Sequence, residues 1–241
     1  MTDAPISTPV NLEDRLRRIE FELFNQCPRG LNWSMMNPDS IDPGHAHIFH
    51  DLNRRTYSTY FESVDGWVSD VGTTPKLGGA IMQTSNTINT QRDLLNEQSF
   101  GDIDFSKESG FEALFKTSSI TDQIIYVGVG SLGAGDGTEQ GYGFKIVNGT
   151  LYALSTYSDG ASATETTVDI TGKATLTSSN IYRAEKLGNA IKYFINGGVV
   201  ASITSGFPTG TDPIVLCFSI KNTIALNKSL YLGSATVTMK F

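Results

Sequence analysis

The sequence predicts an all-β protein, a β-sandwich or jelly roll that follows a short N-terminal helix and an irregular connector. Glycine is abundant, with 24 residues, and only 18% of residues are charged, a composition typical of short strands joined by turns. From residue 60 onward, runs of β-branched and aromatic residues follow one another at short intervals. Two Asn-Gly pairs separate such runs, and this dipeptide is the strongest local signal for a β-hairpin.

Residues 1–30 are expected to form a tail and one amphipathic helix, with Asn11 as its N-cap and Pro28 ending it. Its apolar positions are spaced by four, three and four residues, as in a coiled-coil seam: Leu12, Leu16, Ile19 and Leu23. The helix either packs on its own β domain or joins other copies in a short parallel coiled coil. The pattern of Leu and Ile favours more than two strands in the second case.

Residues 31–59 contain prolines, several Asn and Asp residues and an Asp-Pro-Gly turn signal, which predicts an irregular connector. All three histidines of the chain lie here, in "GHAHIFH". His45 and His47 are one residue apart and share a side of an extended backbone, whereas His50 is out of phase. Two imidazoles are too few for a closed site, but three chains would bring enough to surround an octahedral transition metal ion. The alternative is a solvated turn without metal.

The two Asn-Gly turns predict strand registers. In "GYGFKIVNGTLYALSTY" a type I′ turn at Asn148 and Gly149 pairs Ile146 with Leu151 and Phe144 with Ala153. In "AIKYFINGGVVASI" the turn at Asn196 and Gly197 pairs Phe194 with Val199 and Tyr193 with Val200. Further strands are expected at "FEALFKT", "QIIYVGVGS", "TTVDIT", "IYRAEKL", "PIVLCFSI" and "LYLGSATVTMKF". One sandwich domain over residues 60–241 accounts for all of them.

Composition narrows the classes of function. The net charge of −7 and the lack of a basic cluster argue against nucleic-acid binding. The N-terminus does not have the pattern of a secretory signal, and no apolar run is long enough for membrane insertion. Cys27 and Cys217 do not form a disulfide framework or a zinc motif, and Cys217 lies in an apolar run that predicts burial.

The block "NIYRAEKLGNAIKYFINGGVVASIT" resembles the late hairpin of concanavalin A-like (laminin G-like) jelly rolls. The segment "YFESVDGWVSD" looks like the first strand of that superfamily, and "SLYLGSATVTMKF" like its outer C-terminal strand. The resemblance covers about residues 58–241. It implies a sandwich whose last strand returns beside the first, on a fold that hosts lectins and hydrolases.

The first third resembles a different group. A short heptad helix, a Pro- and Asn-rich connector and a "DPGHxH" turn look like the N-terminal parts of tailed-phage fibre and other virion proteins. This resemblance implies a non-enzymatic virion structural protein, fibre-like or capsid-decorating, assembled in the host cytoplasm. It also implies a homotrimer, contacts with other virion proteins, and a metal clamp of His45 and His47 at the three-fold axis. A lectin-like carbohydrate-binding module outside a virion is the main alternative.

A glycoside hydrolase is the third possibility. Glycosidases on the concanavalin-like fold place two or three carboxylates along one strand, and "GDIDFSKESGFEALF" contains Asp102, Asp104 and Glu108. The expected Glu-x-Asp-x-Glu order is missing, and Asp102 and Asp104 could instead flank a turn. The isolated histidines exclude a credible Ser-His-Asp or Cys-His arrangement.

Ligand contacts are harder to assign. The Gly-rich "GSLGAGDGTEQGYG" is not a phosphate loop, and it contains Asp136 and Glu139, which either ligate Ca²⁺ or lie solvated in a long hairpin loop.

Sugar binding uses exposed aromatic rings, and the candidates are Trp67, Tyr142, Tyr157 and Tyr182. Tyr142 is on the predicted core face. Trp67 and Tyr157 are therefore the preferred ligand-binding residues.

Overall fold

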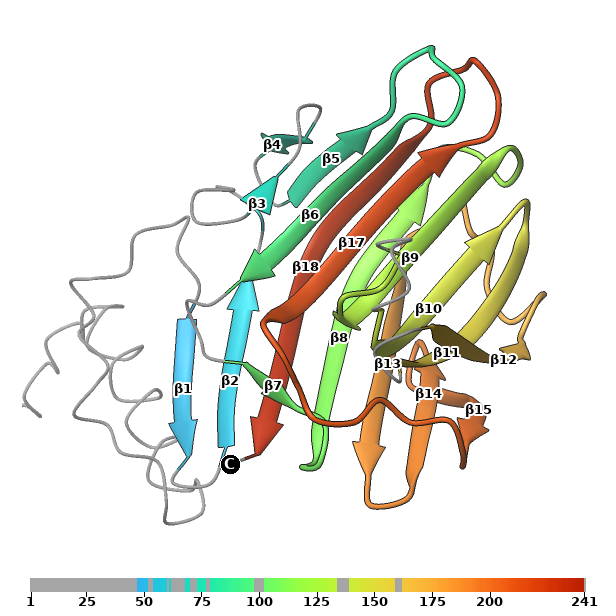
Figure 1. Cartoon of the computed structure of the whole chain (residues 1–241). Helices are drawn as coiled ribbons and strands as arrows, with labels where there is room; N and C mark the ends of the chain where they lie inside the picture. The colour runs from blue at the N-terminus through green and yellow to red at the C-terminus, as the bar shows by residue number, and fades with distance from the viewer. Residues whose placement is uncertain are drawn as a thin grey trace, which may run out of the picture. The chain divides into compact units, whose positions relative to one another are not determined.

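The structure is a computed structural model that describes residues 47–51, 54–59, 61, 68–69, 73–76, 79–97, 102–133, 139–158 and 162–240. The described residues form strands and turns and contain no helix, so none of them belongs to a helix that could span a membrane. The predicted N-terminal helix, with Leu12, Leu16, Ile19 and Leu23, lies outside the described residues. The prediction of an all-β jelly-roll sandwich is confirmed, with two antiparallel sheets (Figure 1).

The larger sheet, here called sheet A, has nine strands. Its main order is β1 (His47–Asp51), β2 (Arg54–Thr59), β18 (Ser229–Lys240), β8 (Ser109–Thr117), β13 (Asn180–Leu187), β14 (Ala190–Ile195) and β15 (Gly198–Ile203). In addition, β4 (Thr73–Lys76) pairs with β5 (Gly79–Gln83), which pairs with β18. The C-terminal strand lies beside β2. The segment "YFESVDGWVSD", expected to be the first strand, contains among its described residues only the strand β3 (Val68–Ser69), which belongs to the other sheet. The neighbour of the last strand is therefore a segment that precedes the expected one.

The smaller sheet, here called sheet B, has seven strands. They run in the order β12 (Ala163–Asp169), β11 (Thr150–Ser158), β10 (Gly141–Val147), β9 (Gln123–Gly130), β17 (Ile214–Asn222), β6 (Gln91–Glu97) and β3 (Val68–Ser69). A two-stranded sheet of β7 (Ile103–Asp104) and β16 (Thr211–Asp212) completes the fold. The six strands predicted by their sequence runs are all present, as β8, β9, β12, β13, β17 and β18.

The first Asn-Gly hairpin has the predicted register, with Ile146 opposite Leu151 and Phe144 opposite Ala153. Asn148 and Gly149 have φ angles of 47° and 89°, the left-handed conformation that a type I′ turn requires at both central positions. Only Gly and a few polar residues such as Asn adopt that conformation readily, which is why this dipeptide fixes the pairing.

The second hairpin keeps Phe194 opposite Val199, but the predicted pairing of Tyr193 with Val200 is wrong. Tyr193 lies opposite Ala201 because the register shifts between Tyr193 and Phe194. A bulge of this kind places one extra residue in one strand and increases the local twist. Turn chemistry sets the register at the loop, and the bulge changes it one residue later.

The sheet also begins earlier than predicted. β1 and β2 lie within residues 31–59, the span expected to be an irregular connector. His47 and His50 therefore belong to edge strand β1, where they lie opposite Ser58 and Arg55. The run Ile48–Phe49 and the segment "RRTYST" contain the β-branched and aromatic residues that favour strands. The pairing of β2 with β18, and of β1 with β2, outweighs the turn residues around them.

Aromatic side chains fill the centre between the sheets. The ring of Phe144 meets the rings of Tyr182 and Tyr193 edge-on, at centroid distances of 5.1 and 5.6 Å. Tyr142 is fully buried, as predicted from its strand face, and its hydroxyl lies 2.8 Å from the Ser109 Oγ. Tyr182 is also fully buried and stacks on Phe115 at 4.0 Å, so it is a core residue and not a sugar platform.

We predict that Phe144→Ala lowers the free energy of unfolding by about 3–5 kcal/mol, because it leaves a cavity among three aromatic rings. Urea denaturation should show a lower midpoint with an unchanged slope. Lys173→Ala, at an exposed turn, is the control and should change stability by less than about 0.5 kcal/mol. A loss equally small for Phe144→Ala would contradict this description of the core.

Candidate functional site

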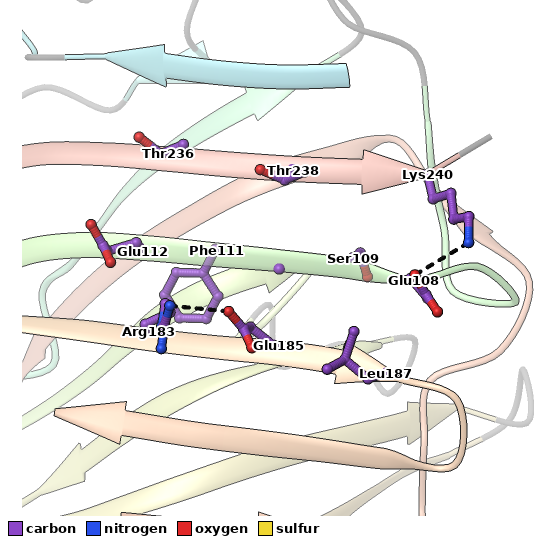
Figure 2. A pocket seen from close by; sticks show the side chains of 11 residues that line it. Glu108, Ser109, Phe111, Glu112, Arg183, Glu185, Leu187, Thr236, Thr238 and Lys240 are labelled. Atoms are coloured by element: carbon purple, nitrogen blue, oxygen red, sulfur yellow. Dashed lines mark hydrogen bonds and ion pairs between the residues drawn. The ribbon is translucent and has the colours of Figure 1, made fainter. Parts of the chain in front are cut away.

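The outward face of sheet A contains a groove of about 390 Å³ that crosses three neighbouring strands. Its walls come from β18, β8 and β13, as Figure 2 shows. The side chains or backbone of eleven residues line it: Glu108, Ser109, Gly110, Phe111, Glu112, Arg183, Glu185, Leu187, Thr236, Thr238 and Lys240. These residues are far apart in the sequence and meet only because β8 pairs with both β18 and β13.

The groove follows from the alternation of side chains along β8. Phe111 and Ala113 are buried in the core. Gly110, which precedes Phe111, and Glu112, which lies between the two, therefore occupy outward positions. Gly110 lies opposite Thr238 on β18 and Glu185 on β13. Because Gly110 has no side chain, the groove passes over it between these two neighbours. A Cβ on Gly110 would lie 3.2 Å from the Ala184 carbonyl oxygen and 3.4 Å from the Glu185 Cγ.

Ion pairs hold most of the charged groups at the groove. Glu108 pairs with Lys240 at 3.3 Å, and Arg183 pairs with Glu185 at 3.2 Å, the two contacts drawn in Figure 2. Glu112 has no ion-pair partner among the described residues, although it lies opposite Arg183 in the register. The groove thus combines two paired cations with one unpaired carboxylate.

Arg183 has a second contact, outside the groove. Its guanidinium carbon lies 4.1 Å from the centroid of the Phe194 ring on β14. A guanidinium over an aromatic face is held by cation–π attraction and dispersion. The ring and Glu185 together fix the orientation of Arg183 before any ligand binds.

The groove therefore offers both hydrogen-bond donors and acceptors on an open surface. Carboxylates accept, the guanidinium and ammonium groups donate, and the hydroxyls of Thr236 and Thr238 do both. The Thr238 hydroxyl lies 3.3 Å from that of Thr56 on β2. Between 32% and 43% of each ion-paired side chain is exposed. The carboxylates of Glu108 and Glu185 therefore lie at a solvated surface and not in an apolar pocket.

Part of the outward face of sheet B is covered by the loop after β9, whereas the outward face of sheet A contains the groove. Leu132, in the Gly-rich loop after β9, packs with Leu154 and Cys217 in a second apolar cluster. A Cβ on Gly128 would lie 2.8 Å from the Leu132 Cδ1, so the glycine makes room for that side chain. The Cys217 thiol donates to the Leu132 carbonyl at 3.2 Å, and burial raises the pKa of this thiol. Its predicted burial is confirmed.

Asp212 holds the same loop from the side of β16. Its carboxylate is buried and accepts hydrogen bonds from the Ser131 hydroxyl at 2.8 Å and the Ile214 amide at 2.7 Å. Desolvation by burial raises the pKa of Asp212, and these hydrogen bonds oppose that shift in part. The Gly-rich segment is therefore a packed hairpin loop over its described residues; Asp136 lies outside them.

The predicted carboxylate cluster is not brought together. Asp104 lies in β7 and accepts a hydrogen bond from the Ser106 amide at 2.8 Å, which with the Ser106 hydroxyl lowers the pKa of Asp104. Asp102 precedes β7 and is exposed. Only Glu108 of the three lines the groove. The alternative interpretation, in which these aspartates flank a turn, fits Asp104.

The other predicted site residues lie away from the groove. Tyr157 is in β11 of sheet B, half-buried and opposite Thr164. Trp67 and His45 are outside the described residues, and His47 is placed only by its register in β1. Over the described ranges no three His, Cys, Asp or Glu side chains gather in a way that could hold a metal ion.

Sequence reasoning missed Gly110, Arg183 and Thr238 as site residues. One local signal was available: in "KESGFEALF" a glycine occupies an outward position between carboxylates at Glu108 and Glu112. The partners on β13 and β18 could be assigned only once the strand order was known.

The sequence matches no protein-family model and no curated protein. Several solved structures share the fold. A protein of unknown function from Shewanella oneidensis MR-1 is 16% identical, with 99% of this chain and 97% of that chain covered and a TM-score of 0.56. The Bacillus licheniformis β-glucanase is 10% identical, with 76% and 97% covered and a TM-score of 0.55. The carbohydrate recognition domain of Emp47p is 15% identical, with 72% and 88% covered and a TM-score of 0.51.

These similarities establish a concanavalin-like jelly-roll fold for the chain. The neighbours include glycoside hydrolases, a transglycosylase and a carbohydrate recognition domain, so enzymes and binding proteins share this architecture. At such low identity the function of a neighbour does not transfer with the fold.

We predict that Asp212→Asn lowers the free energy of unfolding by about 1–3 kcal/mol, because an amide NH₂ would face donors that the carboxylate now satisfies. Ser131→Ala, which removes one hydroxyl donor, should cost less. Because the folded-state pKa is raised above 3.8, the folded chain binds this proton more tightly than the unfolded chain does. The contribution of Asp212 to stability is therefore largest in acid and decreases as the pH rises through the raised pKa. Thermal unfolding of both variants across pH measures this, and a penalty that grows with pH would contradict the assignment.

Proposed function

We propose that this chain is a non-enzymatic binding protein whose β-sandwich binds carbohydrate in the groove of sheet A. The observation that carries the proposal is the groove over Gly110, surrounded by hydroxyl, carboxylate and guanidinium groups. Each sugar hydroxyl both donates and accepts hydrogen bonds, so a site with mixed donors and acceptors suits it. The fold supports the proposal as well, because a carbohydrate recognition domain and several glycoside hydrolases share it.

Preorganisation of the groove also supports binding. Arg183 is held by Glu185 and Phe194, and Glu108 is held by Lys240, before any ligand arrives. Ordering a long side chain at a binding site costs about 0.5–1.5 kcal/mol, and a group that is already fixed avoids this cost.

The environment of the carboxyl groups favours binding over hydrolysis. A glycosidase needs two carboxyl groups on either side of the scissile bond, one of them kept protonated by an apolar site. Here Glu108 and Glu185 lie against cations on an open surface, and Glu112 is exposed. A glycoside hydrolase of concanavalin-like fold remains the alternative, and its activity is measurable.

The finer proposal is that this head belongs to a tailed-phage virion protein, fibre-like or capsid-decorating, and that the ligand is a cell-surface glycan. Support comes from the sequence alone: the seam from Leu12 to Leu23 and the "DPGHxH" element resemble N-terminal parts of such proteins. In that proposal the helix gathers three chains and contacts other virion proteins. A lectin-like module outside a virion has the same groove but needs no trimer.

We predict that the full chain binds neutral glycans on an array and that Thr238→Trp reduces binding at least tenfold. The indole at this outward position would fill the groove beside Gly110. Lys116→Trp introduces the same side chain on β8 outside the groove and should bind as the wild type does.

The array result and a reducing-sugar assay together separate the alternatives. Glycan binding that survives Thr238→Trp would place the site elsewhere. Release of reducing sugar that is lost in Glu112→Gln would replace the binding function by hydrolysis. An empty array would count against carbohydrate binding altogether.

We predict that light scattering of the full chain gives three times the 26.1 kDa chain mass. Leu16→Asp, in the apolar seam, should yield monomers, whereas Arg17→Ala, on another helix face, should not. If the trimer brings His45 and His47 to the axis, metal analysis should find one transition metal ion per three chains. The double substitution to Ala should remove the metal. A monomeric wild type would exclude both the trimer and this site.

A further inference from the structure

The groove of sheet A continues into a row of side chains that crosses five strands. Thr236 on β18 lies opposite Glu112 on β8, and Glu112 lies opposite Arg183 on β13. Arg183 in turn lies opposite Phe194 on β14, and Phe194 opposite Val199 on β15. Neighbouring strands are about 4.8 Å apart, so the row runs roughly 19 Å across the sheet.

The members of this row share the outward face. Val237, Ala113, Ala184 and Tyr193, each next to a row member in the chain, are buried in the core. Because successive side chains alternate between faces, the row members occupy the opposite side. The first three line the groove, whereas Phe194 and Val199 lie beyond it.

The chemistry of the row changes along its length. It begins with a hydroxyl and a carboxylate, passes through the guanidinium of Arg183, and ends in an aromatic ring and an aliphatic side chain. Phe194 is covered by Arg183, with 9% of the residue exposed, whereas Val199 is 65% exposed. Arg183 is therefore the junction between a polar groove and an apolar end.

We propose that the ligand is an extended, neutral oligosaccharide that lies across the strands, with units in the groove and further units on Val199 and on the Arg183 guanidinium, which the Phe194 ring supports from below. We call these three residues the outer subsite. The inference rests on the proposed function and adds the length, direction and charge of the ligand. Sugar rings present apolar C–H faces as well as hydroxyls, so a polar groove followed by an apolar ledge fits successive units of one chain.

The charge of the site excludes acidic sugars. Lys240 and Arg183 already have carboxylate partners, whereas Glu112 has none among the described residues. Among the described side chains of the groove, a ligand carboxylate would meet Glu112 without a free cation to compensate it, and like charges at a recognition site disfavour binding. A uronic acid oligosaccharide should therefore bind more weakly than its neutral counterpart.

The test measures affinity by calorimetry for β-linked gluco-oligosaccharides of two to six units and for oligouronates of equal length. For the wild type, affinity should rise with length. Val199→Ser should lower the affinity for the six-unit chain about three- to tenfold, because it removes apolar area from the outer subsite, and leave the two-unit affinity unchanged. Ile120→Ser is the matched control: Ile120 is also an exposed aliphatic residue, 51% accessible, but lies outside the row.

The prediction about ligand charge is tested with the same ligands. Oligouronates should bind at least tenfold more weakly than the neutral chains, and Glu112→Gln should reduce this difference in affinity. Tighter binding of oligouronates would overturn the assigned charge.

The outcomes distinguish the two proposals. If the two-unit chain binds, binding is lost in Thr238→Trp, and Val199→Ser has no effect on any length, the outer subsite is wrong and the groove function stands. If neither gluco-oligosaccharides nor oligouronates bind and the glycan array is empty, the proposed function fails and the subsite fails with it.

Discussion

The packing of Phe144 against Tyr182 and Tyr193 is the constraint on which the outward surface depends. These rings belong to both sheets, so their contact fixes which residues of β13 and β14 face inward. A slip of one residue would move every side chain of a strand to the other face. The packing of the core therefore determines that Arg183 and Glu185 face outward, where they line the groove.

How much of this architecture is predictable depends on whether the signal is local. The Asn148-Gly149 turn defines its own pairing, because its φ angles are accessible to few other residues, and the sequence-based register was correct. At the Asn196-Gly197 hairpin the first pair was correct and the next was not, since the bulge at Tyr193 depends on twist and packing across the sheet. β1 and β2 were missed for a similar reason: β2 is placed by its pairing with the distant strand β18, and β1 by its pairing with β2.

The candidate site was less predictable than the fold. Carboxylates close together in the sequence, Asp102 and Asp104, suggested chemistry, but Asp104 stabilises a turn beside a two-stranded sheet. The groove instead assembles single residues from three strands that are distant in the chain. One of its residues, Gly110, contributes by lacking a side chain, and this matters only because Thr238 and Glu185 lie on either side of it.

The packing of Leu132 over Gly128 has a consequence for how such a protein diversifies. Any side chain at Gly128 would collide with backbone on β10 and with Leu132, so sheet B is closed to gradual change at that place. On sheet A, by contrast, outward residues such as Glu112 and Val199 are exposed. Such exposed residues can be exchanged one at a time at little cost to folding. Selection for new ligands can therefore act on the outward face of sheet A, while the constrained residues of sheet B keep the fold unchanged.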